Sequence, residues 1–146
     1  MYTIGQVSEM FNIPVSTLRY YDKEGLFPEM QRKSGIRQFT ESDLETLRLI
    51  ECLKKSDLEI KDIKKFMELC SQGPSTYNSR LQIIQQQKEA VLAEMERLNS
   101  SLDMLKYKVW YYTNAILDGN ENRVKAMAPD EMPAEIKDAY LNAHRT

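Results

Sequence analysis

Residues 2–27, YTIGQVSEMFNIPVSTLRYYDKEGLF, decide the fold. Thr3 is typical of a helix N-cap, and the apolar residues after it recur at helical spacing. These apolar residues are Ile4, Val7, Met10 and Phe11. Pro14 disfavours helical geometry at Ile13, so the first helix should end near Asn12 and a second should begin after Pro14. Two short helices with so brief a connection predict a helix-turn-helix.

Residues 27–39 have the pattern of a small β-hairpin, or wing. Ser34-Gly35 is a turn signal between segments that can pair as strands. Thr40 and Asp43 then resemble a capping box, which predicts the start of another helix. Its apolar stripe is Leu44, Leu47, Ile50 and Leu53. A further helix is expected from about residue 59 to 71.

Composition narrows the class of protein. The chain has 146 residues, a net charge of −2 and 42% hydrophobic residues. No apolar run approaches the ~18 residues that a membrane span needs, and the N-terminus lacks the pattern of a signal peptide. Two cysteines give no disulfide framework, so we expect a cytoplasmic protein. The single histidine, His144, lies near the C-terminus, which disfavours histidine catalysis; no cofactor and no metal site are expected.

Residues 76–117 carry the strongest periodic pattern in the chain. Eleven positions from 81 to 116 alternate spacings of three and four, and ten of them are apolar or aromatic. The ten predicted dimerisation residues are Leu81, Ile84, Val91, Met95, Leu98, Leu102, Leu105, Val109, Tyr112 and Ile116. Lys88 interrupts this heptad seam.

A helix over this segment would be about 63 Å long, which is more than a small head can cover. The simplest partner is a second copy of the chain. The alternative is a helix that folds back within one bundle, but no second segment of comparable length exists to receive it. The predicted fold is therefore mainly α. It comprises a winged helix-turn-helix DNA-binding domain over 1–73, a coiled-coil dimerisation helix over 74–118 and a short tail over 119–146 with one or two helical turns around residues 134–143.

TLRYYDKEGL at residues 17–26, followed by the basic hairpin GIRQF at 35–39, resembles the MerR (mercury-resistance regulator) family of transcription regulators. The resemblance covers roughly residues 2–117. It implies a homodimer with an antiparallel coiled coil that binds an inverted repeat in double-stranded promoter DNA. Such regulators distort an unusually long promoter spacer so that RNA polymerase can use it, which makes polymerase an indirect partner.

Both the second helix and the wing carry candidate DNA contacts. Side chains on the helix can enter the major groove and touch bases, whereas cations on the wing can hold phosphates. The candidate residues are Ser16, Thr17, Arg19, Tyr20, Lys23, Arg32, Lys33, Ser34, Arg37 and Phe39. Core packing is the alternative role for Tyr20 and the expected role for Tyr21, and the wing cations could be merely solvated.

Two features depart from the family pattern. Phe39 stands where the family usually has tyrosine, which removes a hydroxyl that could bind phosphate. Asp57 and Glu59 place acidic groups at the start of the fourth helix, where they suit the helix dipole but oppose a docked phosphate.

The signal that the regulator senses is less defined. Metal-sensing members use cysteines near the start of the coil and in the loop after it, and this chain has neither, so metal sensing is not expected. The tail after the coil is too short for an independent ligand pocket. An effector should therefore be small or react covalently.

The two cysteines have different predicted environments. Cys70 falls on the apolar face of its helix, which is the ordinary place for an inert core cysteine. Cys52 falls outside the apolar stripe, near Arg48 and Lys55, and nearby cations favour a nucleophilic thiolate. A cysteine in this helix also resembles the aldehyde- and electrophile-sensing branch of the family. The alternative is that Cys52 is a small residue at a packing seam, with Glu51 among the acids that offset the cations.

Four aromatic residues cluster near the end of the coil: Tyr107, Trp110, Tyr111 and Tyr112. We expect them to pack, with apolar cover from the partner's head, although a small ligand pocket is possible there. An adaptor protein with a coiled coil is an alternative to a DNA-binding regulator, and the basic hairpin argues against it. An enzyme is not expected, because there is no phosphate-binding glycine-rich loop and no nucleophile beside a histidine.

Overall fold

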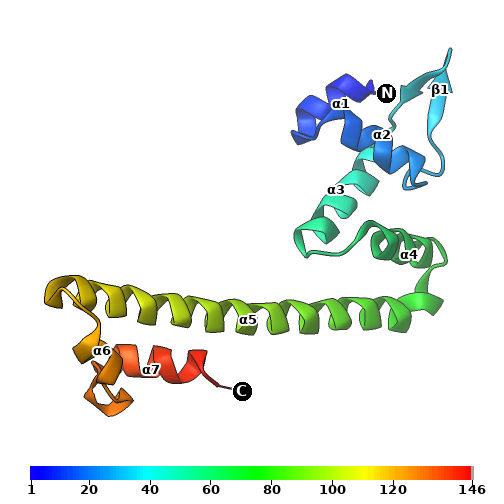
Figure 1. The fold of residues 1–146 in the computed structure, drawn as a ribbon. Coiled ribbons are helices and arrows are strands. Elements are labelled where there is room, and N and C mark those ends of the chain that lie inside the picture. Colours follow the sequence, from blue (N-terminus) through cyan, green and yellow to red (C-terminus); the bar gives the residue numbers. More distant parts are fainter. Residues whose placement is uncertain (146) are drawn as a thin grey trace. The chain divides into compact units, whose positions relative to one another are not determined.

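The computed structural model describes residues 1–145, which divide into two compact units (Figure 1). The first covers Met1–Glu89 and the second begins at Ala90. The first unit holds α1 (Ile4–Phe11), α2 (Val15–Lys23), β1 (Gln31–Lys33), β2 (Ile36–Gln38), α3 (Glu41–Lys55), α4 (Ile60–Ser71), the 3-10 turn Pro74–Thr76 and the start of α5 (Tyr77–Asp118). The second holds the rest of α5, α6 (Asn122–Ala126), the 3-10 turn Pro129–Glu131 and α7 (Ala134–Ala143).

Local signals in the sequence fix both ends of α1. The Thr3 hydroxyl accepts a hydrogen bond from the Gln6 amide at 3.2 Å, and the Thr3 amide donates to Gln6 Oε1 at 2.9 Å. These two bonds form a capping box that satisfies free amides at the start of the helix. Asn12 ends α1 in the left-handed conformation with φ 53°. The predicted limits of the first helix are confirmed.

The wing forms as predicted. β1 and β2 pair antiparallel, with Arg32 opposite Arg37. Ser34 and Gly35 make the turn with φ of 52° and 79°, and two positive φ values are the signature of a type I′ turn. This turn matches the twist of the paired strands, so the two-residue connection holds the hairpin in register.

A single apolar core lies beneath the helices of the first unit. Its fully buried members are Val7, Leu18, Tyr21, Leu26, Phe39, Leu44, Leu47, Ile50 and Ile63. The predicted stripe on α3 supplies three of these, and the Thr40–Asp43 capping box that begins α3 is present. Burial of this apolar surface is the main force that holds α1, α2 and α3 together.

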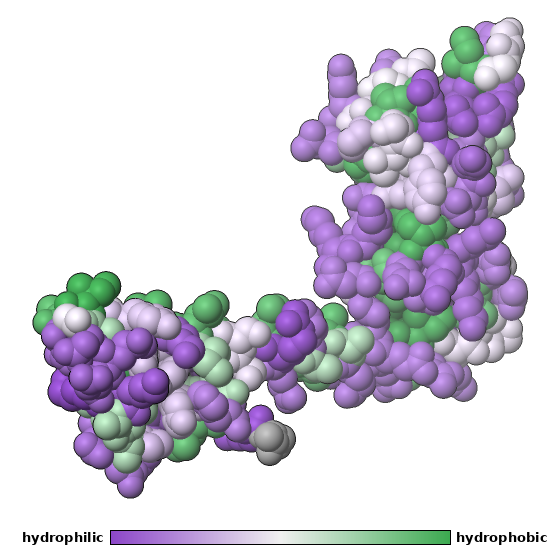
Figure 2. Space-filling model, viewed as in Figure 1, coloured by the Kyte–Doolittle hydropathy of each residue, from purple (hydrophilic) through white to green (hydrophobic). Residues whose placement is uncertain are grey.

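The helix α5 is 42 residues long, close to the predicted span. Nine of its ten apolar seam residues are exposed in the described chain and Val91 is half-buried; Leu98, for example, retains 52% of its surface. Figure 2 shows hydrophobic side chains recurring along α5. An exposed apolar stripe of this length is the surface that a partner helix would cover. Within residues 1–145, no helix is both long and apolar enough to cross a membrane.

The tail has a helix where the sequence predicted one or two turns, around residues 134–143, but it is more ordered than expected. The sequence also suggested cover for the aromatic cluster from the partner's head. Instead, α6 and the ten-residue α7 pack against α5 of their own chain and bury Tyr107 and Tyr111. The Tyr107 and Tyr140 rings meet edge to face with centroids 4.8 Å apart. The apolar side chains that provide this cover are widely spaced among polar residues, which made the tail look weakly structured.

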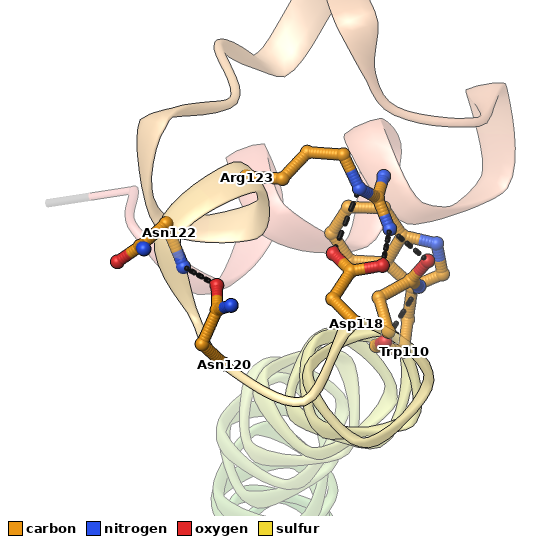
Figure 3. Close-up of polar contacts among 6 residues, drawn as sticks. Trp110, Asp118, Asn120, Asn122 and Arg123 are labelled. Carbon is orange, nitrogen blue, oxygen red and sulfur yellow. Dashed lines mark hydrogen bonds and ion pairs between the residues drawn. The ribbon is translucent and has the colours of Figure 1, made fainter.

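Arg123 fastens α6 to the end of α5 (Figure 3). Its Nε donates to Asp118 Oδ2 at 2.8 Å, and its Nη2 donates to Asn114 Oδ1 at 2.9 Å. Asn114 in turn donates to the Trp110 carbonyl at 2.9 Å. The Arg123 side chain remains about half exposed, so these bonds orient the tail more than they stabilise it.

Candidate nucleic-acid interface

Helix α2 presents one polar face to solvent. Leu18 and Tyr21 are buried in the core, which turns the opposite side of the helix outward. The exposed predicted contacts are Ser16, Arg19, Tyr20 and Lys23, and Thr17 is half-buried. Their spacing places the exposed four along one side of the helix, as insertion into a DNA groove requires.

Tyr21 fixes the position of α2 against α3. Its ring is buried, as expected from the sequence, and its hydroxyl donates to Glu51 Oε1 at 3.0 Å. Lys54 Nζ donates to the same hydroxyl at 2.9 Å. Burial is the main cause that raises the pKa of Tyr21, so the phenol stays protonated and can donate to Glu51. These bonds hold the exposed face of α2 at a fixed angle to the core.

Asp22 connects α2 to the wing. Arg32 Nη2 lies 2.9 Å and Arg37 Nε 2.7 Å from the same oxygen, Asp22 Oδ2. The Asp22 side chain is only 10% exposed, whereas that of Arg32 is 47% exposed. Both arginines were predicted from the sequence as DNA contacts, whereas Asp22 was not. The signal that could have found it is an acidic residue at the end of the helix that precedes the wing, because all charged residues of the wing strands are basic.

Phe39 requires a correction. It was included among the candidate DNA contacts, but its side chain has no exposed surface and its ring packs edge to face on Phe27, with centroids 5.5 Å apart. Its backbone also pairs with Tyr2 through hydrogen bonds of 2.8 and 2.9 Å. An apolar ring fits this site because a buried hydroxyl would need a partner. Phe39 therefore holds the base of the wing to the core and does not face DNA.

The tip of the wing is exposed. Lys33 and Ser34 both lie on the surface, and Arg37 is half-buried beside Asp22. The hairpin thus offers cations at its tip and along its side, in the arrangement that phosphate contacts use. At the start of α4, Asp57 has φ 63° and Glu59 is the N-cap without a side-chain capping bond.

The surroundings of Cys52 agree only partly with the predicted cationic environment. Cys52 is exposed on α3, outside the buried stripe. The Arg48 guanidinium lies over the Phe11 ring, 5.7 Å from its centroid, so this cation is oriented toward α1. Lys55 is exposed. Cys70 is half-buried on α4, less enclosed than a core cysteine.

Comparison with known proteins agrees with this geometry. Residues 2–70 match the family described as MerR HTH family regulatory protein. A relative from Haemophilus influenzae, described as an uncharacterized HTH-type transcriptional regulator, is 38% identical over 133 residues, covering 90% of this chain and 96% of the relative.

Two solved structures are also similar. One is HiNmlR, described as a MerR family regulator lacking the sensor domain, bound to promoter DNA. It is 38% identical with a TM-score of 0.65, and the match covers 84% of this chain and 98% of HiNmlR. The other is a MerR family transcriptional regulator from Bacillus thuringiensis, 40% identical with a TM-score of 0.59 over 74% of this chain and 96% of that one.

Proposed function

The chain belongs to the MerR family of helix-turn-helix regulatory proteins, and from that membership we propose that it binds a palindromic promoter element as a homodimer and remodels it in response to a signal. The observation that carries the proposal is the shared surface of α2 and the wing. The exposed side of α2 offers groups that can read base edges, and the wing offers cations for phosphates. HiNmlR, bound to promoter DNA, supports the same assignment.

The test of DNA binding begins with selection of duplexes from a random pool, followed by fluorescence anisotropy across a salt series. We expect an inverted repeat and a steep fall in affinity with salt. Arg19→Ala should relax base preference, whereas Lys33→Ala should weaken all sequences about equally. Lys125→Ala, an exposed cation on α6, is the matched control and should change neither property. Binding that is weak and insensitive to salt would contradict the proposal and favour a coiled-coil adaptor.

The homodimer is proposed from the exposed seam of α5. Leu98 lies in the middle of the seam and half of its surface is exposed. Leu98→Asp should convert the dimer to a monomer in light-scattering measurements, because it places a charge in the apolar interface. Ala93→Asp, on the outer side of the same helix, introduces the same charge and should leave the dimer intact. A wild-type chain that is monomeric at micromolar concentration would contradict the proposal.

For the signal, we propose covalent sensing of an aldehyde or another electrophile at Cys52. The thiol is exposed on α3, outside the buried stripe, so it is open to attack by a small electrophile. Addition of the S–H group across an aldehyde C=O gives a hemithioacetal and needs no other reactant. Ser56, one turn after Cys52, accepts a hydrogen bond from Gln87 of α5, so a bulkier, polar side chain at this site would alter how the head packs against the start of the coil.

The test compares Cys52→Ser with Cys70→Ser, the matched control. Alkylation of the wild-type dimer should modify Cys52 first, as located by mass spectrometry, and should change in vitro transcription. Cys52→Ser should abolish this response and Cys70→Ser should keep it. If modification of Cys52 leaves transcription unchanged, the regulator responds to a noncovalent small molecule instead, and a search should begin at Trp110.

A further inference from the structure

The distal part of α5 and α7 enclose an apolar groove of about 1120 Å³ within the second unit. Its floor consists of the seam residues Leu102, Leu105 and Val109, and α7 contributes Ile136 and Leu141 to its wall. The three floor residues are 49%, 61% and 69% exposed. The groove is therefore continuous with the stripe that a partner helix would cover.

The wall of this groove carries two carboxylates without a partner. Glu135 and Asp138 both line it, and neither takes part in an ion pair among residues 1–145. The third acid, Asp103, already accepts a hydrogen bond from Asn142 and lies near Lys106. Of the lining residues, only Lys106 and Arg145 are cations. The groove thus has room for a further cation beside Glu135 and Asp138.

The heptad frame identifies which part of a second copy would face the groove. In an antiparallel pair, a seam position followed by a spacing of three on one helix lies opposite a seam position followed by a spacing of four on the other. Two registers pair ten of the eleven seam positions in this way. In one register Lys88 lies opposite Leu105, and in the other opposite Tyr112. Both registers bring Lys88, the residue that interrupts the seam, to the stretch of α5 that borders the groove.

The side of α5 beside Lys88 also fits this pairing. Leu92 lies about 40° around α5 from Lys88, on the same side of the seam as Lys106, which lines the groove. In a two-fold antiparallel pair, like flanks face each other. Leu92 is 46% exposed, although it lies beside the seam, where polar residues are usual. In a pair of copies, the apolar wall of the groove, such as Leu141 on α7, would cover the exposed Leu92 of the other copy.

We propose that the groove between α5 and α7 receives the α5 of a second copy, that the partner copy's Lys88 pairs there with Asp138 and Glu135, and that its Leu92 packs on α7. This inference rests on the homodimer proposed above. It assigns the tail a role in dimer specificity and explains Lys88 by complementary charge. A lysine at a seam position restricts the register, because only alignments that bring it to a carboxylate leave its charge paired.

The first test uses the wild-type protein. Isotope-labelled and unlabelled copies are mixed, allowed to exchange and treated with a carbodiimide, which joins a lysine to a carboxylate without a spacer. We expect a peptide that links Lys88 to Asp138 or Glu135 and carries one labelled and one unlabelled half. Mixed-isotope links in which Lys88 is absent, or joined only to other carboxylates, would overturn the proposal.

The second test exchanges the charges. Lys88→Glu should raise the dimer dissociation constant about tenfold or more by setting like charges together, and Asp138→Lys should act in the same direction. The combined variant should regain most of the affinity. Lys125→Glu, the same charge change on α6, is the control and should have no effect. Single variants that weaken the dimer without rescue in the combination would contradict a direct pairing.

The outcomes separate the two proposals. A monomeric wild-type chain contradicts the homodimer itself. A stable wild-type dimer that lacks both the Lys88 cross-link and the charge-exchange rescue contradicts only the role of the groove.

Discussion

Arg37 Nε donates to Asp22 Oδ2 across 2.7 Å and so joins the wing to the end of α2. Arg32 shares the same oxygen. One carboxylate therefore sets the direction of two cations on the face proposed to contact DNA. Charge-assisted bonds of this kind are short and directional, so Asp22 acts as a positioning residue for the wing.

Asp22→Asn should lower affinity for the selected operator about tenfold, because an amide oxygen holds the two wing cations less firmly than the carboxylate that they share. The slope of affinity against salt should stay the same, since both arginines remain. Arg37→Ala should instead reduce that slope by about one. Anisotropy titrations across a salt series measure both effects. Tighter binding by the Asp22→Asn variant would mean that the carboxylate merely screens the arginines.

Ser34→Asn should stabilise the protein by about 0.5 kcal/mol, because Asn-Gly suits the two positive φ values of a type I′ turn better than Ser-Gly. Ser34 has φ 52° and lies at the tip of the wing. Urea unfolding measures the change. Lys33→Asn, in β1 and outside the positive-φ positions, is the control and should give no stabilisation. A loss of stability in the Ser34→Asn variant would contradict the assigned turn.

Glu121→Gln should make Tyr111 titrate at lower pH. The interaction with the Glu121 carboxylate is the main cause that raises the pKa of Tyr111 to about 12, with burial as the next cause. Because this value lies above the ordinary 10.0, the stabilisation is complete below pH 10.0 and is lost as the pH rises toward about 12. The tyrosinate absorbance, compared with that of Tyr111→Phe, follows the titration. An unchanged midpoint would exclude Glu121 as the cause.

Val124→Ala should loosen the tail more than Arg123→Ala does. Val124 is 1% exposed in the cluster with Tyr107 and Tyr111, so its truncation should cost about 2 kcal/mol. Arg123 is half exposed, and its loss should cost less than about 1 kcal/mol. Hydrogen exchange of α7 amides reports each change locally. Amides of α1 serve as the internal reference and should keep their protection.

Much of the fold could be predicted because its signals are local. Thr3 and Asn12 limit α1 through bonds that span only a few residues, and Ser34-Gly35 specifies its own turn. The outward face of α2 also follows from helical spacing alone. These features depend on φ, ψ and hydrogen bonds within one element, which a single sequence records.

Features that depend on tertiary contacts could not be predicted. The pairing of Asp22 with Arg37 joins residues on different elements, and nothing in the spacing indicates it. Phe39 was included among the DNA contacts because it stands where the family usually has a tyrosine, yet its ring lies in the core. The cover of Tyr107 by Tyr140 links the coil to a tail whose composition suggested little order. In each case the partner is distant in the sequence.

The wing is held at three points: the type I′ turn at its tip, the Asp22 carboxylate along its side and the buried Phe39 at its base. A hairpin restrained in this way loses little conformational entropy when it meets a ligand. The favourable entropy of DNA binding should therefore come from released counterions, and ordering of the wing should cost little entropy. Most of the deformation on binding would then fall on the duplex, which is the more compliant partner at that contact.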